Sequence, residues 1–99
     1  MAYRVEFAAS VEAHFDTLTA RERATVIAAV DRQLLHEPLK ETRNRKPLRP
    51  NPVAPWELRV GPLRVFYEVV GGENGTVRIL AVGRKERNVL WVGHKEIRL

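Results

Sequence analysis

The sequence predicts an α+β domain in which a strand, two helices and a three-stranded antiparallel meander follow one another. Three observations lead to this class. The apolar residues first alternate with polar ones, then recur at helical spacing, and alternate again beyond residue 55. A chain of 99 residues, 44% of them hydrophobic, can bury one core, so we expect residues 1–99 to form a single domain.

The first 18 residues predict a strand followed by a short helix. Residues 3–7 alternate apolar and polar side chains, as in a strand with one buried face. Ser10 is suited to cap the N-terminus of the helix. The side chains expected to face the core recur at helical spacing, at Val11, Phe15 and Leu18.

A second helix is predicted directly after the first. Thr19 and Glu22 have the spacing of a capping box, and Pro38 ends the helical pattern. Because almost no residues separate the two helices, they should form an antiparallel hairpin packed on one face of the sheet. The core-facing residues expected in this helix are Ile27, Val30 and Leu34.

The second half of the chain predicts a linker and then the meander. Residues 37–55 contain five of the six prolines, which favours an extended linker. Two alternating runs, 56–60 and 63–69, flank the turn pair Gly61-Pro62 and predict a β-hairpin. This alternation places Arg64 on the face opposite the core residues Leu63, Val65 and Tyr67.

A glycine-rich turn at 71–75 leads into a third strand at 77–82. Residues 88–96 are compatible with a short helix or with further extended chain, although Gly93 disfavours a long helix. The predicted order is therefore β-α-α-β-β-β with a C-terminal tail.

The positive charge is concentrated in two segments. Residues 40–49 carry five basic and one acidic residue, and residues 83–99 carry five basic and two acidic ones, within a formal net charge of +5. Such clusters favour a polyanionic partner, either nucleic acid or an acidic protein segment. A solvated basic surface is the alternative interpretation.

Several classes of site are excluded by composition. The chain has no cysteine, and its histidines, His14, His36 and His94, are not at metal-ligand spacing, so we expect no disulfide, metal or cofactor. No apolar run approaches the roughly 18 residues of a membrane span, and no signal peptide is evident. A cytoplasmic protein is expected. The common catalytic motifs are also absent.

Arginine and lysine therefore remain as candidates for chemistry, because their cationic groups bind phosphate oxygens. Arg64 is the leading candidate, with cross-strand pairing to Glu57 or Glu68 as the alternative. Basic residues that could bind RNA beside it are Arg45, Lys46, Arg49, Arg59 and Arg84.

Trp91 and His94 could complete such a site. Trp91 could stack on an unpaired base or pack in the core, whereas Tyr67 and Trp56 are assigned to the core. His94 could transfer a proton near neutral pH or simply be exposed. His14 and His36 lie in the helical segments and are interpreted as structural.

Residues 56–69, WELRVGPLRVFYEV, and 82–87, VGRKER, resemble the RelE/ParE superfamily of toxins from bacterial toxin–antitoxin pairs. The resemblance extends over essentially the whole chain and implies the fold order given above. RelE-type members cleave messenger RNA in the ribosomal A site without a metal. ParE-type members block DNA gyrase without cleaving anything.

The resemblance also implies roles for individual residues. Arg64 matches the arginine that stabilises the scissile phosphate, Lys85 and Arg87 match further functional basic residues, and Trp91 stands where RelE has a catalytic tyrosine. Tryptophan cannot exchange a proton as tyrosine does, so either His94 substitutes or catalysis depends on electrostatics. Other departures are Pro55 and Glu57 in place of two lysines, and Lys46 in place of a glutamate base.

The sequence thus predicts the toxin of a toxin–antitoxin pair, acting as a ribosome-dependent mRNA endoribonuclease. A cognate antitoxin would cover the basic surface with an acidic, partly helical segment. Arg64, Lys85 and Arg87 favour the nuclease, whereas the missing lysines and glutamate favour a ParE-like gyrase inhibitor. A basic protein-binding module is the third alternative.

Overall fold

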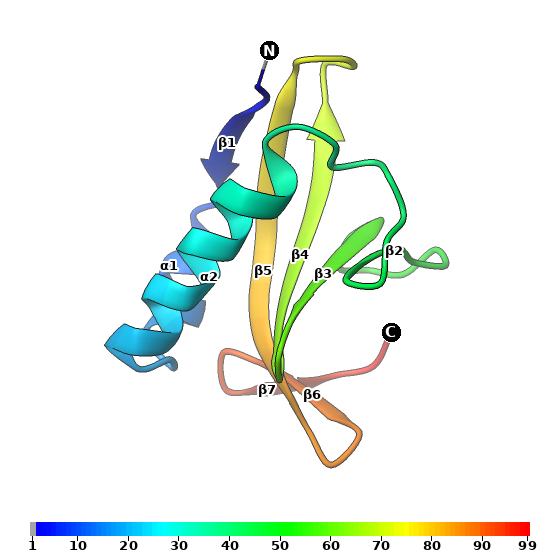
Figure 1. The fold of residues 1–99 in the computed structure, drawn as a ribbon. Helices are drawn as coiled ribbons and strands as arrows, with labels where there is room; N and C mark the ends of the chain where they lie inside the picture. Colours follow the sequence, from blue (N-terminus) through cyan, green and yellow to red (C-terminus); the bar gives the residue numbers. More distant parts are fainter. Residues whose placement is uncertain (1) are drawn as a thin grey trace.

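The computed structural model describes residues 2–99 and confirms the α+β class. Two helices lie on one face of a twisted sheet, and the longest strand runs the length of the molecule (Figure 1). The elements are β1 (Arg4–Phe7), α1 (Ser10–Phe15), α2 (Ala20–Leu34), β2 (Arg45–Pro47), β3 (Trp56–Val60), β4 (Leu63–Val70), β5 (Thr76–Glu86), β6 (Val89–Val92) and β7 (Lys95–Ile97).

The strands of residues 2–99 form one sheet in the order β2-β3-β4-β5-β6-β7, with antiparallel neighbours along this path. The first strand, β1, lies parallel to the N-terminal part of β5. The C-terminal part of the same edge of β5 pairs with β6. In Figure 1, β1 and the β6–β7 hairpin accordingly lie at opposite ends of β5.

Two segments differ from the prediction. The proline-rich linker contains a strand, β2, whose three residues pair with β3, and Pro47 is tolerated at its end because β2 is an edge strand. The C-terminal tail is extended rather than helical and forms β6 and β7. Arg87, Asn88 and Gly93 adopt positive φ angles of 51°, 68° and 62°, which allows the two short turns that reverse the chain.

The helical predictions hold in part. His36, assigned to the second helix, is exposed beyond the end of α2, and Leu18, assigned to the first, lies after the end of α1 but is buried as expected. Thr19 and Glu22 form the expected capping box at the start of α2. Ser10 does not cap α1: Ala9 is the N-cap residue, and the Ser10 hydroxyl donates instead to the Leu80 carbonyl at 3.4 Å. Ile27 is 46% exposed and does not face the core, because the buried stripe of α2 is rotated onto Val26, Ala29, Val30 and Leu34.

Apolar side chains pack on both faces of the sheet. The larger cluster lies between helices and sheet and includes Leu63, Val65 and Tyr67, as predicted. The Tyr67 hydroxyl donates to the Pro38 carbonyl at 2.6 Å, and burial raises the pKa of this phenol above its ordinary value. Trp56 stacks on Tyr67 with ring centroids 6.1 Å apart, which agrees with its assignment to the core.

A smaller apolar cluster lies on the face away from the helices. Phe66 and Ala81 form its centre on β4 and β5, and Leu48 from the proline-rich segment packs against this cluster.

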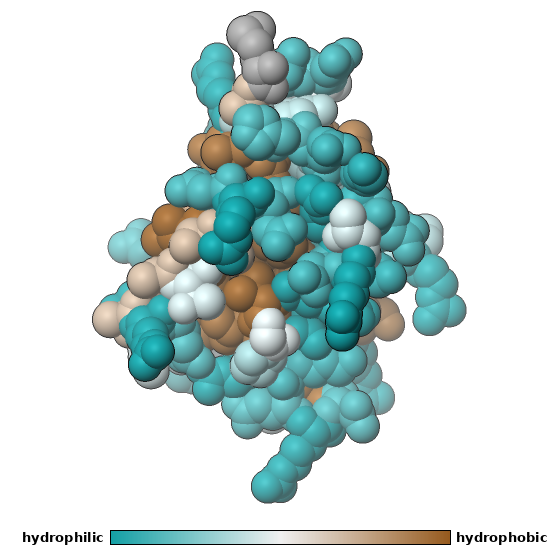
Figure 2. Space-filling view, viewed as in Figure 1, coloured by the Kyte–Doolittle hydropathy of each residue, from teal (hydrophilic) through white to brown (hydrophobic). Residues whose placement is uncertain are grey.

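Neither helix of residues 2–99 has the length and apolar composition that a membrane span requires. On the face shown in Figure 2, hydrophilic side chains predominate and hydrophobic ones gather along and beside α2.

His14 fills the gap on the edge of β5 between β1 and β6. Its ring nitrogen Nδ1 accepts a hydrogen bond from the Val82 N–H at 3.3 Å, which requires an unprotonated Nδ1. Burial lowers the pKa of His14 below its ordinary value of 6.5. The structural role predicted for this histidine is thus supported by a specific contact.

This contact predicts a pH-dependent stability. As pH falls, His14 is protonated in the unfolded chain before it is protonated in the folded one. The contribution of His14 to the free energy of unfolding is therefore fully present above pH 6.5 and is lost as pH falls from 6.5 toward the lower pKa of the folded state. Urea denaturation at about pH 8 and about pH 5 should reveal this loss. In His14→Gln the amide oxygen can accept the same hydrogen bond and does not titrate, so this variant should lose less stability between the two pH values. An equal loss in wild type and His14→Gln would contradict the assignment.

Candidate functional site

A cleft of about 440 Å³ lies on the face of the sheet away from the helices, and we call it the sheet cleft. Arg64 on β4 and Lys85 on β5 both line it. The predicted orientation of Arg64, opposite the main core, is therefore correct. The other residues that line the sheet cleft are Glu57, Asn88, Val89, Leu90, Glu96, Ile97, Arg98 and Leu99.

Arg64 is held in place by its own hairpin. Its Nη1 donates to the carbonyl oxygens of Gly61 and Leu63 at 2.7 and 2.9 Å, and its Nε lies 3.8 Å from Oε1 of Glu57. The side chain is only 14% exposed, and this burial lowers the pKa of the guanidinium, while the Glu57 carboxylate acts in the opposite direction. Arg64 thus both lines the cleft and makes the cross-strand pair considered as its alternative.

Glu57 is the buried acidic residue beneath this cleft, with 7% of its surface exposed. Its Oε2 accepts a hydrogen bond from Arg59 Nε at 3.0 Å, so the carboxylate lies between two guanidinium groups. The lining side chains comprise three basic residues, Arg64, Lys85 and Arg98, and two acidic ones, Glu57 and Glu96, a net charge of +1. The sheet cleft is therefore only weakly basic.

Trp91 and His94 lie elsewhere, in a cleft of about 620 Å³ that we call the Trp91 cleft. The strand register explains the separation: Lys85 pairs with Leu90, whereas its neighbour Arg84 pairs with Trp91, and successive residues point to opposite faces. Arg87 is at the turn between β5 and β6 and lines neither cleft. The five predicted catalytic residues are thus not brought together.

Comparison with known proteins supports the resemblance found in the sequence. The family model described as the ParE toxin of type II toxin–antitoxin systems, parDE, matches residues 2–89. This chain belongs to the ParE toxin family. The toxin also resembles a chain in the crystal structure of the toxin–antitoxin complex RelBE2 from Mycobacterium tuberculosis, with 29% identity and a TM-score of 0.67.

The structural similarity covers 86% of the toxin and 100% of the chain in that complex. A search of curated protein sequences found no significant match. Together, the family match and the structural match confirm that the chain is a member of the RelE/ParE superfamily.

Most basic residues proposed to bind RNA have partners within the toxin. Arg45 donates to the Gln33 carbonyl in the last turn of α2, where a cation is favourable. Lys46 lies 3.5 Å from Glu41, and Arg59 pairs with Glu57. Arg49 is exposed on the segment between β2 and β3.

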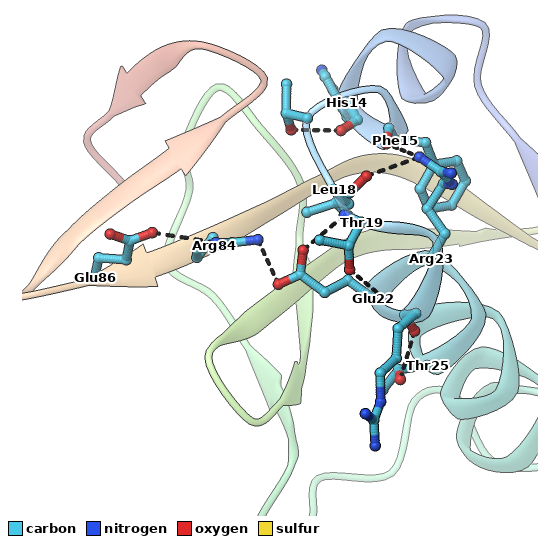
Figure 3. Close-up of polar contacts among 11 residues, drawn as sticks. His14, Phe15, Leu18, Thr19, Glu22, Arg23, Thr25, Arg84 and Glu86 are labelled. Atoms are coloured by element: carbon cyan, nitrogen blue, oxygen red, sulfur yellow. Dashed lines mark hydrogen bonds and ion pairs between the residues drawn. The ribbon is translucent and has the colours of Figure 1, made fainter.

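Arg84 links the end of the sheet to the start of α2. Its guanidinium pairs with Glu22 and lies 3.6 Å from Glu86. Figure 3 marks both contacts. The Thr19 N–H hydrogen bond, together with the Arg84 charge, lowers the pKa of Glu22. Arg84 is therefore engaged in a structural network.

The sequence analysis named Glu57 as a cross-strand partner of Arg64 but did not include it among the site residues. The available signal was its position: Glu57 shares a strand face with Arg59 and lies diagonally across the hairpin from Arg64.

No group of three or more potential metal ligands occurs within residues 2–99.

Proposed function

We propose that this toxin acts by binding and blocking DNA gyrase, as ParE-like toxins do, and cleaves no nucleic acid. The observation that carries this proposal is the distribution of the predicted nuclease residues over two clefts. RNA cleavage by general acid–base catalysis needs the proton-transfer groups within about 3 Å of the same reacting atoms. Arg64 and Lys85 lie in one cleft, whereas Trp91 and His94 lie in the other.

The electrostatics of the sheet cleft support the same proposal. Arg64 is partly neutralised by Glu57, and the lining has a net charge of only +1. An RNA strand carries a charge on every phosphate and is best bound by several unpaired cations. A protein surface, with charges of both signs, matches this cleft better. The match to the ParE toxin model over residues 2–89 agrees with this reading.

Cleavage of ribosome-bound mRNA is the second candidate, because Arg64 and Lys85 line one cleft and the RelBE2 chain is 29% identical. In that mechanism Glu57 would accept the 2′-hydroxyl proton, and Arg64 would stabilise the charge that develops on the phosphate. Glu57→Gln would then abolish cutting. The Glu57→Gln variant therefore tests the nuclease mechanism in the sheet cleft.

The purified toxin should be assayed for inhibition of gyrase supercoiling and, separately, for A-site cuts by primer extension on a translating messenger. We expect supercoiling to stall and the messenger to remain intact. Lys85→Ala should weaken inhibition about tenfold, as expected for loss of a charged contact. Arg21→Ala, an exposed charge outside the sheet cleft, serves as the matched control. Cuts without an effect on supercoiling would overturn the proposal in favour of the nuclease.

A further inference from the structure

The Trp91 cleft has a chemistry that the proposed function does not use. It lies between the α1–α2 connection and the β6–β7 hairpin, and its lining residues come from both and from the end of β5. We propose that this cleft binds an arginine side chain presented by the cognate antitoxin. The proposal rests on membership in the toxin family and is independent of whether gyrase or mRNA is the target.

Trp91 supplies a fixed aromatic surface. The residue is 39% exposed, whereas its neighbours Leu90 and Val92 are buried and hold the strand in place. Its strand pairs with β5 on one side and β7 on the other, so the backbone cannot turn the ring inward. Trp91 takes no part in either of the two aromatic pairs found within residues 2–99. Its indole is available to a cation, the favourable partner for its ring face.

The charge of the cleft selects a cation over a phosphate. Two carboxylates, Asp16 and Glu86, and one guanidinium, Arg84, line it, so the lining has a net charge of −1, and Arg84 is further neutralised by its bond to Glu22. None of the nine ion pairs of residues 2–99 includes Asp16. Figure 3 shows Arg84 placed between Glu22 and Glu86. A nucleic acid stacked on Trp91 would bring its phosphates toward these carboxylates.

Arginine fits an indole face flanked by carboxylates better than lysine does. A planar guanidinium can stack on the indole and still donate to a carboxylate at its edge, whereas an ammonium group offers no stacking surface. A volume of about 620 Å³ accommodates such a side chain together with part of its backbone. Trp91 and Asp16 together therefore define the recognition of one arginine.

The antitoxin is the partner that this cleft fits. The toxin carries a formal net charge of +5, so a segment that covers it is expected to be acidic overall. An acidic segment would be repelled at the Trp91 cleft unless it placed a positive side chain there. One arginine in an otherwise acidic segment would therefore fix the register of the complex and exclude wrong partners.

The first test uses a defined probe, acetyl-Gly-Arg-Gly-amide, titrated into the full-length toxin. The readout is the indole N–H resonance of Trp91, assigned by its loss in Trp91→Phe. We expect a saturable shift with a Kd in the millimolar range, about what a single side chain supports. The citrulline analogue, which lacks the charge, should bind at least about fivefold more weakly.

Matched variants locate the binding. Asp16→Asn and Glu86→Gln should each weaken the peptide about threefold or more. Asp31→Asn, an exposed carboxylate on α2 outside the cleft, should not. Equal binding of the arginine and citrulline peptides, no shift at all, or a larger Trp91 shift with a single-stranded oligonucleotide would each overturn the proposal.

The second test uses the complex with the cognate antitoxin. Asp16→Asn should weaken antitoxin binding about tenfold while the activity of the free toxin stays at the wild-type level, which separates this test from that of the target. Changing each antitoxin arginine to glutamine should identify one whose effect is not additive with Asp16→Asn. Strict additivity for every arginine would show that the cleft receives none of them.

Discussion

Gly83→Ala is expected to lower the free energy of unfolding by about 3 kcal/mol, because the added methyl group has no space. A Cβ at residue 83 would lie 2.3 Å from the Trp91 carbonyl oxygen and 2.9 Å from Cγ2 of Val92. The first of these contacts is with backbone that pairs with β5, so relief requires separating β5 from β6. The loss of stability should therefore be accompanied by distortion of the C-terminal hairpin.

Urea denaturation followed by circular dichroism measures this effect. Gly72→Ala is the control, because a Cβ there meets nothing within 4 Å, although its φ of +68° adds backbone strain. We expect this control to lose about 1 kcal/mol, the usual cost of removing a glycine from the left-handed region. A Gly83→Ala loss no larger than that of Gly72→Ala would contradict the close approach of the two strands.

Gly83 also matters for both clefts. It pairs with Arg64 on β4 and with Val92 on β6, so it lies between the strands that carry the two sites. The two residues after it, Arg84 and Lys85, face the Trp91 cleft and the sheet cleft respectively. A change at Gly83 is therefore expected to impair antitoxin binding and toxicity together.

Glu57→Gln should lower the free energy of unfolding by about 3 kcal/mol, since it leaves a largely buried guanidinium without its carboxylate. The side chains of Glu57 and Arg64 are only 9% and 14% exposed, so water cannot fully replace the lost partner. Arg59 can still donate to the amide oxygen, but it loses its ion pair with the carboxylate in the same variant. Glu73→Gln, an exposed carboxylate in the turn before β5, is the matched control and should be neutral.

A double variant distinguishes loss of the pair from loss of a single charge. Replacing both Glu57 and Arg64 by leucine should recover most of the stability lost in Glu57→Gln, because a buried ion pair is often no more stabilising than apolar side chains of similar size. Urea midpoints of the three proteins provide the comparison. A double variant less stable than Glu57→Gln would mean that other contacts of Arg64, such as those to Gly61 and Leu63, dominate.

The candidate site could be predicted only in part. Arg64 was found because alternation within a single strand specifies its face. The separation of Lys85 from Trp91 could not be derived, since it depends on the length of β5 and on the turn at Arg87-Asn88. With residues 88–96 compatible with helix or strand, the face of Trp91 was undetermined.

The features that could be derived from the amino-acid order alone are those that depend on neighbours along the chain. The capping box at Thr19, the hairpin turn at Gly61-Pro62 and the core face of β4 all follow from local chemistry and periodicity. The toxin family likewise followed from two short segments. These features need no information about distant residues.

Which charges are paired and which strands are neighbours became clear from the three-dimensional fold. The short strands β2, β6 and β7 are stabilised by partners rather than by their own patterns. Glu57 is buried against Arg64 because the hairpin register brings them together. Pairing, burial and the charge of a cleft depend on residues far apart in the chain. For this reason the sequence indicated a single basic site, whereas the fold separates Arg64 and Lys85 in the sheet cleft from the Trp91 cleft, whose lining has a net charge of the opposite sign.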